Sequence, residues 1–275
     1  MKNILIPFDF SEIAENALVY AISLFEDAEI TFHLLHVHEV RPSQLLSEQY
    51  NEQWFGKMDD EAESKLKDHV AHLNQTTADN HRFKSLIKSD SIVHALETVL
   101  NSLEIDLMVS GTRGARGKSD IFLTTRTLAM IHKVRSCPIL VVPFDYDFVP
   151  IKKIVFSTNY QKSVTPKEIK PIVDLSTLYD AHIEVVNLSE DQYLSAVQKE
   201  NKQHIEGLLA SFNHSFKKLE WLESEANTLT TYLKTSESQL LCLINHKYNF
   251  FNKLLQEDVI KRTSFYSEVP LLIIP

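Results

Sequence analysis

Three of the five glycines lie within residues 111–117, in the run GTRGARG that directly follows the apolar stretch DLMVS. Glycine tolerates positive φ and has no Cβ, so a ligand can approach its main-chain N–H groups closely. A glycine cluster between a predicted strand and a predicted helix is typical of a phosphate-binding loop. Arg113, Arg116 and Lys118 add a basic patch to this loop, with Arg126 just beyond it. The segment therefore predicts an anionic ligand.

Two other predicted strands end in residues that could contact such a ligand, at 7–9 and 36–38. In an open parallel sheet, ligands bind beyond the carboxyl ends of the strands where the strand order reverses, so we expect both ends to converge with the glycine loop. The Asp9 carboxylate would accept a hydrogen bond from an adenine amine or a ribose hydroxyl, and Val37 would offer the base an apolar surface. The simpler role for Asp9 is to form the turn before Ser11, which would cap the first helix.

Apolar runs typical of strands alternate with helical periodicity along the whole chain, which is the pattern of βαβ units. Short runs of Val, Ile and Leu indicate parallel strands that are buried on both faces. In the first half, the predicted strands are KNILIPFD, EITFHLLHV, RFKSLIK, DLMVSGT and CPILVVP, and the predicted helices cover 11–25, a polar stretch that ends near 74, 91–102 and 125–134.

The second half repeats this order. The run IKKIVFSTNY at 151–160 matches MKNILIPFDF at 1–10, and EVPLLIIP at the C-terminus matches SCPILVVP. Between these ends we predict the strands HIEVVNL, FKKLEWL and QLLCLIN, and helices over 203–212, 229–235 and 251–262. The stretch FDYDFVP is the predicted linker. The chain is thus predicted to form two domains, 1–146 and 151–275.

Several ordered motifs of the first half resemble the universal stress protein family in its tandem two-domain form. They are ILIPFDFSE, LLHV, the glycine loop followed after nine residues by hydroxyl residues, and CPILVVP. The resemblance implies an α/β fold of two tandem flavodoxin-like (Rossmann-like) domains, each a five-stranded parallel sheet of order 3-2-1-4-5 with helices on both faces. Because single-domain members of the family dimerise through the last strand, it also implies that 139–142 and 271–274 pair within this chain.

The ATP-binding branch of the family has the pattern G-x-x-G, nine residues, then G and S or T. Thr124 stands where the third glycine of that pattern would be, and its β-branched side chain takes space beside the expected phosphates. Threonine is nevertheless a good N-cap for the helix expected from 125, whose first N–H groups favour an anion. The resemblance implies that the cofactor-binding residues are Pro7, Asp9, Val37, Gly111, Gly114, Thr124 and Thr125.

The second half lacks these features. Asn159 stands at the position of Asp9 and Leu188 at that of Val37, and no glycine follows Gly207. A loop without glycine cannot offer the same exposed backbone to a phosphate. We therefore expect the second domain to be a degenerate copy without a phosphate loop, which serves as a pairing partner for the first.

Other motifs point to different chemistry, and each has a plainer interpretation. The run GTRGARGKS misses the nucleoside-triphosphatase pattern G-x-x-x-x-G-K-[ST] by one position, and no glycine-rich turn of a dinucleotide fold follows the first strand. His36 and His38 would share a strand face as zinc ligands do, but no third ligand is identifiable and strand-end histidines commonly bond to backbone. His69 and His72 fit a solvated helix face. The serines and threonines near the loop have no recognisable base, which favours a binding protein over an enzyme, with weak ATP hydrolysis at most.

Composition narrows the class of protein. The net charge of −9 disfavours a nucleic-acid partner, which would be bound through Lys and Arg. Cys137 and Cys242 lie in or beside apolar runs and are predicted to be core thiols in a reducing compartment. The N-terminal apolar stretch is too short for a signal peptide, and no run approaches the roughly 18 residues of a membrane span. We therefore expect a cytoplasmic protein with no membrane partner.

Together these features predict a cytoplasmic stress-response protein whose first domain binds ATP or a related adenine nucleotide, with no residue that specifies magnesium. Its output would be conformational or would pass through an unidentified protein partner, and a homodimer is compatible with the pairing of the two domains. The alternative is a non-nucleotide-binding scaffold or chaperone-like member of the family with a decayed site. Thr124 and the second half without a phosphate loop favour that alternative.

Overall fold

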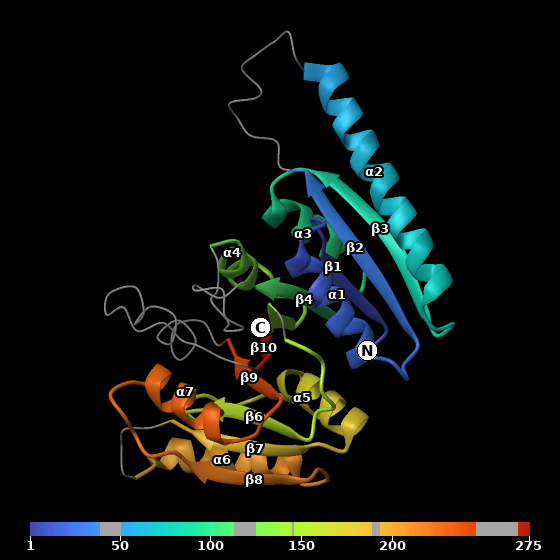
Figure 1. Ribbon diagram of the computed structural model, residues 1–275. Coiled ribbons are helices and arrows are strands. Elements are labelled where there is room, and N and C mark those ends of the chain that lie inside the picture. Colours follow the sequence, from blue (N-terminus) through green and yellow to red (C-terminus); the bar gives the residue numbers. More distant parts are fainter. Residues whose placement is uncertain (39–50, 113–124, 145, 189–192, 246–268) are drawn as a thin grey trace. The chain divides into compact units, whose positions relative to one another are not determined.

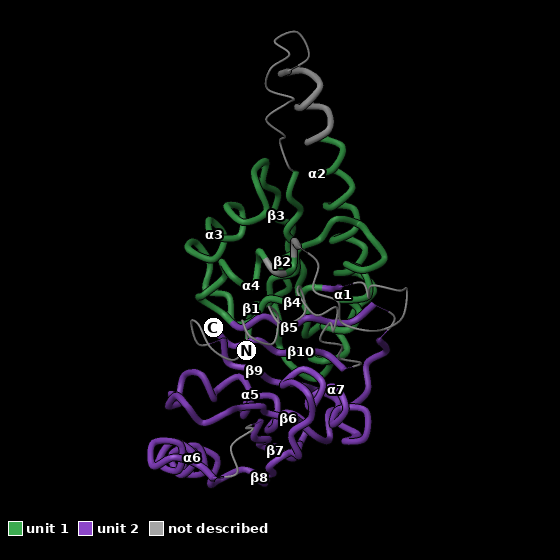
Figure 2. Tube along the Cα trace, turned by 90° about the vertical axis from the view of Figure 1, so that its left-hand side faces the viewer, with its two compact units in different colours: residues 1–110, 125–137 green, residues 111–124, 138–275 purple. Residues whose placement is uncertain are grey.

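The computed structural model describes residues 1–38, 51–112, 125–144, 146–188, 193–245 and 269–275 (Figure 1). Its chain divides into two compact units, the first made of residues 1–110 and 125–137 and the second of residues 111–124 and 138–275 (Figure 2). The predicted domains 1–146 and 151–275 follow the sequence repeat, and that division stays a prediction.

The first part of the chain alternates strands and helices. Its elements are β1 (Asn3–Pro7), α1 (Glu12–Leu24), β2 (Ile30–His38), α2 (Asn51–Thr76), β3 (His81–Ser89), α3 (Ile92–Ser102), β4 (Leu107–Thr112) and α4 (Thr125–Lys133). Ser11 and Ser91 cap α1 and α3, because the side-chain oxygen of each accepts a hydrogen bond from a backbone N–H three residues later. These strands and helices are the ones that the sequence predicts for this segment.

The sheet of the first unit is parallel. Strand β1 pairs with both β2 and β4, and β2 pairs with β3, which gives the order β3-β2-β1-β4. Ile4, Leu5 and Ile6 of β1 are completely buried, as expected for a central strand that is covered on both faces. The carboxyl ends of β1 and β2 consequently lie at the same edge of this sheet.

The second unit contains the remaining elements. They are β5 (Ile139–Pro143), β6 (Lys153–Thr158), α5 (Pro166–Tyr179), β7 (His182–Asn187), α6 (Ala196–Leu209), β8 (His214–Lys218), α7 (Glu225–Thr235), β9 (Leu240–Ile244) and β10 (Leu271–Ile274). Strands β6 to β10 are parallel and follow the order β8-β7-β6-β9-β10. This is the predicted 3-2-1-4-5 order, so the tandem flavodoxin-like α/β fold is confirmed.

Strand β5 joins the second unit on the far side of β10. The two strands are antiparallel, and Leu140 lies opposite Leu272. Both leucines are completely buried. The predicted pairing of 139–142 with 271–274 is therefore confirmed, and β10 has a hydrogen-bonded neighbour on each side instead of an exposed edge.

Helix α5 is a finding that the sequence analysis missed, since no helix was predicted between 160 and 182. Readable signals stand at its start: Thr165 caps it, Pro166 is its first residue, and Glu168 completes a capping box. Pro171 lies inside the helix and lacks the N–H that would continue the ladder of hydrogen bonds. The helical periodicity of this segment is consequently obscured by proline.

Element boundaries in the second unit also differ from the predicted ones. Helix α6 begins at 196, seven residues before the predicted start at 203, because Ser195 and Gln198 form a capping box ahead of a polar first turn. Strand β8 covers 214–218, whereas the run 216–222 was predicted. This is an edge strand with weak apolar alternation, which makes its ends hard to read. The helix predicted over 251–262 lies outside the described residues.

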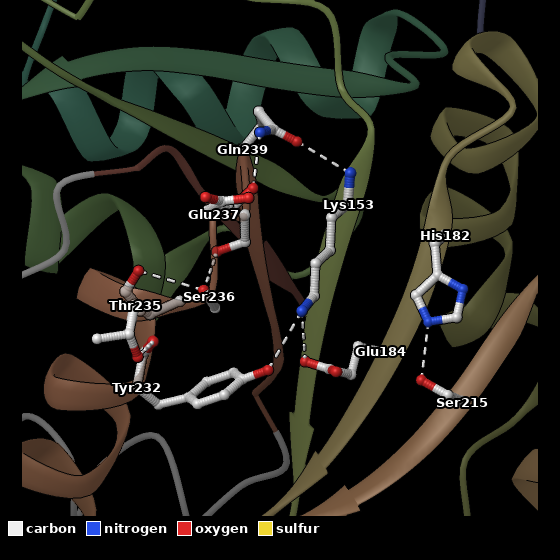
Figure 3. Close-up of polar contacts among 11 residues, drawn as sticks. Lys153, His182, Glu184, Ser215, Tyr232, Thr235, Ser236, Glu237 and Gln239 are labelled. Atoms are coloured by element: carbon white, nitrogen blue, oxygen red, sulfur yellow. Dashed lines mark hydrogen bonds and ion pairs between the residues drawn. The ribbon is translucent and has the colours of Figure 1, made fainter.

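In both copies, one side-chain oxygen accepts hydrogen bonds from the backbone at the start of the first strand. In the first unit, Asp106 Oδ2 accepts hydrogen bonds from the backbone N–H of Asn3 (2.9 Å) and from that of the preceding residue (2.7 Å). In the second unit, Gln239 Oε1 accepts from the backbone N–H of Lys153 (2.9 Å) and from that of the preceding residue (3.0 Å) (Figure 3). The internal repeat therefore extends from the sequence to individual side-chain bonds.

The side chains on these first strands pair differently in the two copies. Asn3 Oδ1 lies 3.2 Å from His33 Nε2 on β2. At the corresponding positions of the second unit, Lys153 Nζ lies 3.0 Å from Glu184 Oε2 and 3.4 Å from the Tyr232 hydroxyl (Figure 3). A neutral hydrogen bond in one copy thus corresponds to a partly buried ion pair in the other.

Both cysteines are buried and free, as predicted from the sequence. Burial raises the pKa of the Cys137 thiol to about 12, so the reactive thiolate is scarce at neutral pH. Burial also raises the pKa of Cys242. Within the part of the chain that the structure describes, no helix is long and apolar enough to cross a membrane.

The β5–β10 pair can be tested by placing a charge at Leu140. We expect Leu140→Asp to lower the free energy of unfolding by roughly 3–5 kcal/mol, because it puts an unpaired carboxylate at a completely buried position. Urea unfolding followed by circular dichroism measures this change. Val149→Asp is the control, since Val149 is 44% exposed. Equal stability of the two variants would contradict the pairing.

His33 predicts a loss of stability in acid. Burial, and to a smaller extent Lys84, lowers the pKa of His33 below its ordinary value of 6.5. The unfolded chain therefore takes up this proton at a higher pH than the folded chain, so the free energy of unfolding falls as the pH drops below 6.5. Urea unfolding at pH 7.5 and 5.0 should show a smaller loss in His33→Gln than in the unmodified protein. If the free energy of unfolding falls equally in both proteins, the protonation of His33 is not the cause of the loss.

Candidate functional site

The carboxyl ends of β1 and β2 hold three of the predicted site residues. Pro7 is the last residue of β1 and pairs with Leu35 of β2. Val37 lies two residues beyond Leu35 on β2 and is half-buried. Asp9 lies two residues beyond Pro7 and is exposed. The structure thus places Pro7, Asp9 and Val37 at one edge of the first sheet.

Asp9 lies in a tight turn between β1 and α1. Its Oδ1 accepts a hydrogen bond from the backbone N–H of Ser11 at 3.1 Å, and Ser11 in turn caps α1. The simpler role predicted for Asp9, forming the turn before the helix cap, is therefore confirmed. Because a carboxylate has about four acceptor positions and this residue is exposed, the bond to Ser11 leaves capacity for a ligand.

His36 fixes the backbone of this turn from the neighbouring strand. Its Nδ1–H donates to the carbonyl oxygen of Phe8 at 2.9 Å, and its ring lies 5.1 Å from the ring of Phe10. The rings of Phe8 and Phe10 meet edge to face with their centroids 5.3 Å apart. Two aromatic rings and an imidazole therefore surround the backbone on either side of Asp9.

Helix α2 adds two side chains to the same turn. His69 stacks on the ring of Phe8 at 5.1 Å and lies 3.5 Å from Glu15 Oε1 on α1. The Lys65 ammonium lies 4.2 Å from the centre of the Phe10 ring. The assignment of His69 to a solvated helix face was wrong, because the ring of Phe8, just after β1, packs against it. The sequence alone does not show which turn of a long polar helix faces a distant strand end.

The zinc interpretation of His36 and His38 gains no support from the structure. Among the described residues, no group of three or more His, Cys, Asp or Glu side chains could hold a metal ion. His36 bonds to backbone, which is the plainer role expected of it, whereas His33 bonds to the side chain of Asn3.

The residues predicted to contact phosphate are described only in part. Gly111 is the fifth residue of β4 and is half-buried, and Thr112 after it accepts a hydrogen bond from the backbone N–H of Phe144 at 2.8 Å. Thr125 is the first residue of α4. Gly114 and Thr124 lie outside the described residues. The roles of these four predicted residues, Gly111, Gly114, Thr124 and Thr125, stay predictions.

The corresponding turn of the second unit is closed by its own side chains. Asn159 Oδ1 accepts from the backbone N–H of Gln161 at 3.1 Å, as Asp9 does from Ser11. From α6, Gln198 Nε2 donates to the carbonyl oxygen of Asn159 at 2.9 Å, and Asn201 Nδ2 donates to that of Tyr160 at 2.8 Å. Both amides are buried, so the surface beside this turn is occupied.

Leu188 is also unlike its counterpart Val37. Its side chain is 1% exposed, whereas Val37 is half-buried at the open end of β2. A buried leucine cannot offer a face to a ligand. Among the described residues, the end of β1 in the first unit is therefore more accessible than the corresponding turn at Asn159.

Comparisons with known proteins agree with this architecture. A model of the universal stress protein family matches residues 1–143. A universal stress protein from Archaeoglobus fulgidus superposes with a TM-score of 0.64 at 14% identity, over 99% of this chain and 95% of that chain. A protein of unknown function from Pseudomonas aeruginosa superposes with a TM-score of 0.60 at 12% identity, over 100% and 92%.

The same fold occurs in the cytoplasmic domain of a prokaryotic cation chloride cotransporter, with a TM-score of 0.50 at 10% identity over 99% of this chain and 94% of that chain. These structural likenesses show the fold. No curated protein matches the chain.

The contrast between the two turns limits the nucleotide site that the sequence predicts to one per chain. The stoichiometry of ATP in titration calorimetry should not exceed one, because the turn of Asn159 is covered by buried amides from α6. Asn159→Asp restores the carboxylate without removing these amides, so this variant should still bind one equivalent. Two equivalent sites in the unmodified chain would contradict the prediction.

Proposed function

The chain belongs to the universal stress protein family, and on this premise we propose that its first domain, residues 1–146, binds ATP or a related adenine nucleotide. The second domain, residues 151–275, is in this proposal a degenerate copy that supports the first. The single observation that carries the proposal is the position of Asp9 and Val37 at the carboxyl edge of one parallel sheet.

The chemistry of this edge suits an adenosine. Asp9 is exposed and has acceptor capacity beyond its bond to Ser11, which fits the adenine amine or a ribose hydroxyl. Val37 and Pro7 are half-buried and offer apolar contact to a flat base. The imidazole of His36 and the ring of Phe10 lie beside the same turn, so the surroundings combine apolar surface with a few polar atoms.

The glycine loop suits the phosphates. In our proposal the backbone N–H groups of Gly111 and Gly114 donate to phosphate oxygens, together with Thr124 and with Thr125, the first residue of α4. The first N–H groups of a helix and its dipole favour an anion there. Arg113, Arg116 and Lys118 would contribute positive charge to a protein whose net charge is −9.

The proposed output is a change of conformation or the recruitment of a protein partner in the cytoplasm, in a stress response. None of the serines and threonines near the glycine loop has a recognisable base in the sequence, so the proposal assigns binding, with weak ATP hydrolysis at most. Magnesium, a homodimer and the identity of the partner are not part of it.

The proposal is tested on freshly purified protein, which is denatured and analysed for released nucleotide, and by calorimetry with ATP. We expect Gly114→Val to weaken binding at least about tenfold, equivalent to about 1.4 kcal/mol, because its side chain covers the N–H groups of the loop. Thr124→Gly should tighten binding, since it restores the third glycine of the family pattern.

Gly207→Val is the matched control for these variants. Gly207 lies on α6, and a Cβ added there meets no atom within 4 Å. This variant should bind as the unmodified protein does. If the unmodified protein releases no nucleotide, binds none by calorimetry and gains nothing from Thr124→Gly, the nucleotide proposal is wrong and a scaffold role takes its place.

A further inference from the structure

The turn after the first strand has the same unusual backbone in both copies. Phe10 has φ 60° and Tyr160 has φ 57°, so a large side chain sits in the left-handed region each time. This region is costly for residues with a Cβ, and such strain persists only where the surroundings hold it. In each copy the residue before it, Asp9 or Asn159, accepts a hydrogen bond at 3.1 Å from the N–H two residues later.

One carbonyl of this turn is held in the same way in both copies. His36 Nδ1–H donates to the carbonyl oxygen of Phe8 at 2.9 Å. Asn187 Nδ2–H donates to the carbonyl oxygen of Thr158 at 3.3 Å. Asn187 lies beside Thr158 in the parallel pairing of β7 with β6, and His36 lies one step beyond the Pro7–Leu35 pair of β2 with β1. The two bonds are therefore equivalent, although the donors are chemically different.

The two donors can replace one another in this bond. An asparagine amide donates from Nδ2, and an imidazole donates from Nδ1 when that nitrogen carries the proton. Asparagine is therefore the conservative replacement for His36 that keeps the bond to the carbonyl.

We propose that His36 is a positioning residue, which holds the Phe8 carbonyl so that Asp9 faces the ligand of the first domain. This inference rests on the proposed nucleotide site. In the second copy Asn187 makes the equivalent bond beside a turn that α6 has closed.

The test compares the affinity for ATP of the full chain with His36, with His36→Asn and with His36→Leu. We expect His36→Asn to bind within about twofold of the protein with His36, because its amide supplies the donor that Asn187 supplies in the second copy. His36→Leu should bind about tenfold more weakly than His36→Asn, because the carbonyl has lost its donor and the turn is held for less of the time.

A second measurement does not need the ligand. Amide hydrogen exchange of Ser11, whose N–H bonds to Asp9, reports whether the turn is held. Exchange should be fast in His36→Leu and slow both in His36→Asn and in the protein with His36. If exchange follows this order but no variant binds ATP, the nucleotide proposal fails and the positioning role stands. If exchange and affinity are the same in all three proteins, the positioning role is wrong.

Discussion

The left-handed residue that follows the first strand of each copy is the constraint on which the strand-end chemistry depends. At Phe10 and Tyr160 the chain turns away from the sheet into the following segment, at a cost of roughly 1–2 kcal/mol for a residue with a Cβ. This turn places the side chain of the preceding residue, Asp9 or Asn159, outside the end of the sheet. A bond to the carbonyl one residue earlier, from His36 or Asn187, holds the arrangement.

The two copies keep this backbone and differ in the side chains around it. In the first copy the turn is surrounded by titratable groups, among them His36, His69 and Lys65. In the second copy, buried amides of α6 occupy the same surroundings. Duplication of a domain allows such divergence. Both copies need the backbone geometry in order to fold, whereas the side chains at one strand end are free to change. In our proposal the second copy is mainly structural, and its last strand pairs with β5.

The sequence predicts the fold well because parallel strands that are buried on both faces produce continuous apolar runs. The runs that became β1, β4, β9 and β10 are of this kind. The sequence analysis does not predict α5, because Pro166 and Pro171 obscure its helical periodicity, although the capping box at its start can be recognised in the sequence. It also misses the contacts of Lys65 and His69 with Phe10 and Phe8, since nothing local in a polar helix shows which of its faces meets a distant strand.

The turn role of Asp9 could be read from the sequence, because the spacing to the helix cap at Ser11 is local. The bond from His36 to Phe8 could not, because it depends on the register of two strands. The most direct test of the account is a crystal structure of the full chain grown with saturating ATP. We expect one nucleotide per chain, with its base against Val37 and within hydrogen-bond distance of Asp9. A chain without nucleotide at that edge, or with one beside Asn159, would contradict the account.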